Sequence, residues 1–310
     1  MLDHDPTFEG FMDDQHGIRR GARRCAQAVN ALHSIPYFTS DLATELAPFG
    51  ITDHSSVYLA GRASPLGSVN AVVVTAVFSS FAPGLIAERI PALWELISPA
   101  RAIQARQDAV ATALERLLGT ETVQSAALAE AAKLATAAAA ACAPAGRPVY
   151  AANSALDLPD RPHVALWHAA TMLREYRGDG HIAVLGHFEL TGVDSLVIDC
   201  ASSHGMAKEI VMPMRGWTEA EWSAGRERLT DRGLMDPQGR LTARGVAVRD
   251  EVEAETGRLD RQPYEALGPA DVDRLGRYVR ELVGTAADAG VFPPPLRDFF
   301  APTADAWNAL

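Results

Sequence analysis

Four polar residues in the first part of the chain have the side chains that proton transfer and ligand binding require. His33, Tyr37 and Asp41 recur at four-residue spacing, with Pro36 interrupting any helix between them, and Arg62 follows in the stretch AGRASPLG. An imidazole and a phenol can move protons, and a guanidinium binds carboxylate or carbonyl groups. We predict His33 and Tyr37 as catalytic residues and Asp41 and Arg62 as ligand-binding residues. The alternative is structural: a buried His33–Tyr37 pair, and an Arg62 that binds helix carbonyls.

A second group of polar residues lies in the stretch LREYRGDGHIAVLGH. Arg177, Asp179 and His181 surround a predicted turn between two helices, and His187 follows nearly two turns along the second helix. An Asp179 carboxylate that orients the His181 imidazole would raise its pKa and make it an acid or base near neutral pH. We predict Asp179 and His181 as catalytic residues, and Arg177, His187 and the distant Trp217 as ligand-binding residues. The alternative is that Asp179 caps the helix carrying His181 and pairs with Arg177.

Motifs for the common cofactors and metals are missing from the sequence. Residues 178–183 fit a loosened dinucleotide fingerprint, but they follow a predicted helix instead of a strand. There is no phosphate-binding loop, HExxH or GxSxG pattern. The closely spaced histidines are five or six residues apart, whereas two ligands on one helix face need a spacing of three or four. We predict neither a metal nor a cofactor.

The composition indicates a folded acidic protein. The chain has 310 residues, 48% of them hydrophobic, with a formal net charge of −11 and three cysteines. This length suits about two domains, and few, scattered cysteines suit a reducing compartment. The longest apolar stretch, residues 69–85, is too short and too interrupted for a membrane span. We expect a soluble cytoplasmic protein without membrane contacts, and the charge disfavours a generic polyanion binder.

The periodicity predicts a mainly α-helical fold. We expect a flexible arm at 1–17, an N-terminal helical domain at 18–147, a winged helix-turn-helix-like domain at 148–262 and a C-terminal helix and tail at 263–310. In the second domain, helices at 164–176 and 181–190 flank the turn, and a loop covers 204–217. A helix at 218–232, a two-stranded wing at 233–242 and a closing helix at 243–259 complete the order of a winged helix-turn-helix.

The stretch RGLMDPQGRLTARGVAVRDEVEAETGRL resembles MarR-type winged-helix regulators. Most of the chain resembles an uncharacterised actinobacterial helix-turn-helix family. That resemblance is carried by His33 with Tyr37 and Phe38, by YLAGRASPLG, by LREYRGDGH and by GWTEAEW. It implies a MarR-like winged-helix fold, packed on the N-terminal helices and dimeric through terminal helices.

The charges of the predicted winged-helix segment do not favour DNA binding. Residues 161–260 contain 12 Lys and Arg against 16 Asp and Glu, a net charge of −4, and the reading helix begins with Glu219 and Glu221. A duplex binder must neutralise several phosphates, and the predicted loop before this helix exceeds the three or four residues of a helix-turn-helix turn. DNA binding is therefore not expected.

The preferred function is a small-molecule site in the cleft between the two domains. We predict a cofactor-independent acid/base enzyme of actinobacterial specialised metabolism that works as a homodimer. The alternatives are a ligand-responsive transcriptional regulator that binds DNA and a non-catalytic binding or assembly protein.

Overall fold

The predicted mainly α-helical class is confirmed. The computed structural model describes residues 6–203 and 205–309, and the chain is about 76% helical. The helices of the first half are α1 (Pro6–Ser34), α2 (Asp41–Leu46), α3 (His54–Ala63), α4 (Ala71–Val77), α5 (Pro83–Leu96), α6 (Pro99–Leu118), α7 (Thr120–Val123), α8 (Ala126–Ala140) and α9 (Pro148–Ser154), with short 3-10 turns at Ile35–Phe38, Ala47–Phe49 and Ser64–Leu66.

The second half continues with helices only. They are α10 (Pro162–His187), α11 (Gly192–Cys200), α12 (Lys208–Met214), α13 (Glu219–Asp231), α14 (Ala243–Leu259), α15 (Gln262–Leu267), α16 (Pro269–Asp288), α17 (Pro294–Phe300) and α18 (Ala304–Ala309). Among the described residues no single helix is long and apolar enough to cross a membrane; α10 and α11, bent by 97°, meet that criterion together by length and composition.

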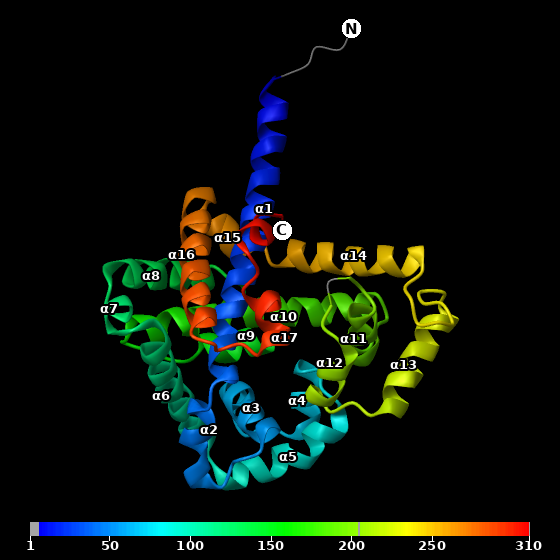
Figure 1. The fold of residues 1–310 in the computed structure, drawn as a ribbon, viewed down its shortest axis with the longest axis horizontal. Helices are drawn as coiled ribbons and strands as arrows, with labels where there is room; N and C mark the ends of the chain where they lie inside the picture. Colours follow the sequence, from blue (N-terminus) through cyan, green and yellow to red (C-terminus); the bar gives the residue numbers. More distant parts are fainter. Residues whose placement is uncertain (1–5, 204, 310) are drawn as a thin grey trace.

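Three apolar clusters hold the helices together. The largest lies among α1, α8, α10 and α16, whose alanines and small side chains allow close helix contacts. A second cluster lies among α2 to α6. A third joins the end of α10 to α11, α13 and α14. Because α10 contributes to the first and the third cluster, it connects the two ends of the molecule (Figure 1).

The expected turn at residues 177–180 is wrong, because α10 runs without a break from Pro162 to His187. Two glycines in four residues favour a turn locally. Packing decides otherwise: a Cβ at Gly180 would lie 2.0 Å from the Arg147 guanidinium, so this glycine allows a buried arginine to approach the helix. The same guanidinium donates a hydrogen bond to the Tyr176 carbonyl of α10.

The expected two-stranded wing is also wrong. Residues 233–242 form a tight turn with one isolated bridge between Met235 and Leu241, and the described residues contain no strand. The Asp236 carboxylate closes this turn by accepting bonds from the backbone N–H groups of Gln238 and Arg240. Only a few residues separate the buried Met235 from α14, which leaves no length for a longer ladder.

The expected loop at 204–217 contains a helix instead. Residue 204 lies outside the described residues, and α12 then occupies Lys208–Met214. Its seven residues include Pro213 and its N-cap is Ala207, so the usual signals of a helix were weak. The connection to α13 is consequently only residues 215–218, with Gly216 at φ +73°. This is the length of a helix-turn-helix turn.

Candidate functional site

A cavity of about 330 Å³ lies between the first half of the chain and α10, α11 and α14. Its walls come from the end of α3, residues 77–80, the middle of α10, α11 and α14. Charged side chains are concentrated there: three arginines (Arg62, Arg174 and Arg249) and four carboxylates (Glu175, Asp179, Asp199 and Glu253) line it. The volume falls within the range of small-molecule sites.

A buried ion pair joins the two halves at this cavity. Arg62 donates from Nε to Glu175 Oε1 at 3.1 Å and from Nη2 to both carboxylate oxygens at 2.6 and 2.7 Å. Both side chains are 4% exposed. Burial by itself would raise the pKa of Glu175, but Arg174 and Arg62 lower it to about 2. The pair is therefore ionised at any physiological pH.

Two further arginines stand beside this pair. Arg174 donates from Nη1 to Glu175 Oε2 at 2.8 Å, and Arg215 lies over the Phe81 ring at 4.4 Å. Tyr58 accepts a bond from Arg62 Nη1 at 2.9 Å and is in hydrogen-bond contact with Arg215. Burial alone would raise the pKa of Tyr58, but Arg62, Arg215 and Arg174 lower it to about 8. Arg62, Arg174 and Glu175 line this end of the cavity, and Arg215 and Tyr58 lie next to them without lining it.

His33 and Tyr37 lie next to this cluster. His33 is buried, its Nδ1 is 3.0 Å from Thr171 Oγ1, and its ring stacks on Trp167 at 5.8 Å. The Tyr37 ring lies 5.3 Å from His33 and 5.0 Å from Tyr58. Burial and nearby arginines hold the pKa of His33 well below 6.5, and burial raises that of Tyr37 to about 12. Both side chains are neutral at pH 7, and neither is among the residues that line the cavity.

Asp41 is not part of this group. Its carboxylate pairs with Arg116 Nη2 at 2.5 Å, between α2 and α6. Asp41 is therefore outside the cavity, at the far side of the second apolar cluster.

Asp179 and His181 both line the cavity, with roles different from either sequence interpretation. The Asp179 carboxylate accepts the backbone N–H groups of Val149 and Tyr150 at 3.0 and 2.9 Å, so it caps α9 and not a helix that carries His181. Burial raises the pKa of Asp179 to about 6. His181 Nδ1 lies 3.1 Å from Thr256 Oγ1, and burial followed by Arg177 lowers its pKa.

The other predicted ligand-binding residues surround the cavity without lining it. Arg177 pairs with Glu253 at 2.7 Å and approaches Asp260 at 3.6 Å. His187 is exposed at the end of α10, with its ring against Phe188. Trp217 donates its indole N–H to the Ser80 carbonyl at 2.9 Å, and Ser80 is a wall residue. Trp217 therefore positions the wall.

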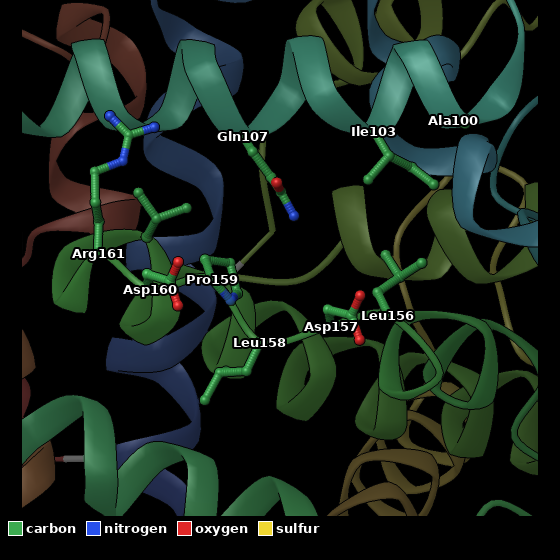
Figure 2. A pocket seen from close by; sticks show the side chains of 10 residues that line it. Ala100, Ile103, Gln107, Leu156, Asp157, Leu158, Pro159, Asp160 and Arg161 are labelled. Atoms are coloured by element: carbon green, nitrogen blue, oxygen red, sulfur yellow. The ribbon is translucent and has the colours of Figure 1, made fainter.

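A larger hollow of about 490 Å³ is found elsewhere, between α6 and residues 156–161. Figure 2 shows Ile103 and Gln107 reaching from α6 toward this segment, where Asp157 and Asp160 lie. Most of the segment's side chains are exposed, and its one ion pair, Arg161 with Asp108, is 3.7 Å long. Although larger, this hollow has no buried charged group, so the smaller cavity is the candidate site.

The turn between α12 and α13 is packed against the first half of the chain (Figure 1). Ala82 N donates to the Arg215 carbonyl at 2.9 Å, beside the Trp217–Ser80 bond. A Cβ at Gly216 would lie 2.8 Å from the Cβ of Leu85. In DNA-bound helix-turn-helix proteins the start of the second helix enters the major groove. Here residues 80–85 contact the turn residues 215–217, which directly precede that helix.

The cations of this segment are also engaged within the chain. Arg228 pairs with Asp194 at 2.6 Å, Arg240 with Asp236 at 2.8 Å, and Lys208 with Glu219 at 2.7 Å. Arg232 binds the carbonyls of residues 188 and 189. Between residues 208 and 244, the guanidinium of Arg226 is left without a hydrogen bond or ion pair to any described residue.

Sequence reasoning missed Glu175, the residue that pairs with Arg62. Glu175 lies within a helix that begins with a strongly apolar stretch from Val164 onward. A carboxylate on such a helix needs a buried partner, and this was the available signal for a pair with Arg62. Within the described chain, no group of three or more His, Cys, Asp or Glu side chains is placed to hold a metal ion.

Comparison with known proteins gives one result. A family described as a helix-turn-helix family matches residues 22–293, which is most of the chain. No curated protein and no solved structure matches.

Proposed function

We propose that the chain, which belongs to a helix-turn-helix family, is a binding protein whose cavity between the two halves binds a small polar molecule. The helix-turn-helix element forms part of the structure around this cavity. One observation carries the proposal. Residues 77–80 form a wall of the cavity, and Ser80 of this wall accepts the bond from Trp217 of the helix-turn-helix turn. The turn therefore helps to shape the cavity.

The composition of the wall supports a specific ligand over a general apolar one. Apolar side chains such as Phe78, Ile182 and Leu196 supply contact area, and the charged groups supply direction. Small-molecule sites combine these two features. The groups able to exchange a proton with a bound ligand are Asp179 and His181, which is how an acid/base enzyme would use this cavity.

The test is to fill the cavity and measure binding. A metabolite library is first screened for compounds that raise the melting temperature of the wild-type protein. These compounds are then titrated by calorimetry into the Ser195→Trp variant, whose larger side chain fills the cavity from α11. Ala183→Trp is the matched control, because Ala183 is exposed on α10 outside the cavity. Binding should be lost in the first variant and kept in the second. Equal binding to both variants would show that the ligand sits elsewhere.

DNA binding is the second candidate, favoured by the family and by the short turn between α12 and α13. It requires the turn to leave residues 80–85 and the paired arginines to become free. A gel-shift titration with random duplex at low salt separates the two functions. A salt-sensitive shift that Arg226→Ala weakens would favour DNA binding, and its absence favours the ligand site.

A further inference from the structure

We propose that the ligand of this cavity is an organic anion, whose carboxylate or phosphate group binds at the arginine end of the cavity. Arg62, Arg174 and Glu175 line this end, and Arg215 and Tyr58 lie next to them without lining it. This inference rests on the proposed function, because it names the chemical class of the molecule bound in the same cavity.

The first argument is charge. Glu175 pairs with two guanidinium groups, those of Arg62 and Arg174, and Arg215 lies close to both of these arginines. The Tyr58 phenol is mostly protonated at neutral pH, so positive charge exceeds negative charge around this carboxylate. A buried positive charge without a counterion is costly. A bound anion removes that cost and gains charge-assisted hydrogen bonds. Arg106, buried on the other side of Arg62 without a carboxylate partner among the described residues, adds to the positive field.

The second argument is the geometry of Arg174. It lines the cavity and is 25% exposed, which makes it more accessible than Arg62. Only its Nη1 is engaged, with Glu175, so its Nε and Nη2 have no hydrogen bond to any described residue. A guanidinium with a free edge binds a carboxylate or phosphate through two parallel hydrogen bonds. Glu175 holds the other edge and so fixes the orientation of the group.

The third argument is the contrast with the opposite end. There Arg249 pairs with Asp199 at 3.2 Å, and Glu253 pairs with Arg177 at 2.7 Å. The charges at that end are paired. The rest of the wall carries Asp179, whose carboxylate accepts two backbone N–H groups, and His181, and its other side chains are mostly apolar. The complementary ligand is therefore an anionic group attached to an uncharged body.

The test compares four probes of nearly the same shape and different charge: benzoate, phenyl phosphate, benzamide and benzamidine. Each is titrated by calorimetry up to about 10 mM at constant ionic strength, since weak fragments bind in the millimolar range. We expect at least one of the two anions to bind about tenfold or more tightly than benzamide. Whichever anion binds better identifies the source as carboxylate or phosphate.

The matched variants are Arg174→Gln and Arg258→Gln. Arg174→Gln should weaken the anion about tenfold or more by removing a charge-assisted pair. Arg258→Gln should not, because Arg258 is exposed on α14 and pairs with Glu255 outside the cavity. A bound anion should also raise the pKa of Tyr58, which a phenolate absorbance titration follows separately.

The outcomes distinguish this inference from the proposed function. If benzamide binds as well as the anions, and Arg174→Gln changes neither, the cavity is a ligand site but the anion inference is wrong. If Ser195→Trp leaves probe binding unchanged, the probes bind outside the cavity and the anion inference is wrong. If none of the four probes binds, the anion inference is also wrong, and the titration of library compounds against Ser195→Trp and Ala183→Trp decides the proposed function separately.

Discussion

Tyr58 should ionise well before the other buried tyrosines of this protein. Burial alone would raise its pKa, but Arg62, Arg215 and Arg174 lower it from 10 to about 8. For the other buried tyrosines burial raises the pKa, to about 12 for Tyr37. The reason is the three guanidinium groups, which favour a phenolate at this one position.

The magnitude follows from the shift. Two pH units at about 1.36 kcal/mol each correspond to about 2.7 kcal/mol in favour of the phenolate in the folded protein. The folded pKa lies below the unfolded one, so this contribution to stability is complete above pH 10. It is lost as the pH falls through 8. At neutral pH the phenol is mostly protonated and the arginine end keeps its excess charge.

The assay is the phenolate difference absorbance as a function of pH, with circular dichroism to confirm that the fold persists. Of the six tyrosines, one should titrate with a midpoint near pH 8. Tyr58→Phe should remove that step, and Arg174→Gln should move it to higher pH by removing one of the three cations. A flat wild-type signal up to about pH 9.5, or a step that survives in Tyr58→Phe, would refute the electrostatic reasoning.

Three further predictions concern stability. Arg62→Met should lower the free energy of unfolding, measured in urea, by about 3 kcal/mol because it leaves Glu175 with one partner fewer. The double variant Arg62→Met/Glu175→Met should lose less of this free energy, because no unpaired charge stays buried. Equal losses in the two variants would contradict a buried pair. Gly192→Ala should lower the free energy of unfolding by about 1–3 kcal/mol, and with it the melting temperature, because the added Cβ would lie 1.6 Å from the Ser79 carbonyl oxygen. The control Gly257→Ala should leave the melting temperature unchanged, because no atom lies near the position of its Cβ. Asp260→Asn should be more stable than the wild type in guanidinium chloride at pH 8, and the difference should shrink toward pH 4. Burial raises the pKa of Asp260 from 3.8 to about 7, so the cost of this carboxyl to stability grows between these two pH values and is complete above pH 7. A pH-independent difference would show that this carboxyl does not titrate as stated.

Local signals were sufficient for many of the helices. The capping box of Thr218 with Glu221 is present at the start of α13, and Ser98 with Gly119 bounds α6. These boundaries depend on side chains within three residues of the helix end, so the sequence contains the whole interaction. Ser125 likewise caps α8 by accepting the backbone N–H of Leu128.

Three of the predicted site residues, Arg62, Asp179 and His181, line the cavity. Each was predicted from its side-chain type and its neighbours in the sequence. Their partners were not predictable, because Glu175 lies 113 residues from Arg62, and Thr256 lies 75 residues from His181. Asp179 illustrates the same point, since it caps α9 from a distance of about thirty residues.

The sequence by itself determined the helical class and many of the helix ends, because helix propensity, capping and periodicity act within a few residues. The tertiary structure decided how the remaining charges are used. It made α10 continuous through Gly178 and Gly180, replaced the wing by a turn, and packed the helix-turn-helix turn on residues 80–85. It also brought Arg62 to the carboxylate of Glu175, which Arg174 also binds. The physical reason is that burial and long-range charge pairing depend on distances in space, which the local sequence does not contain.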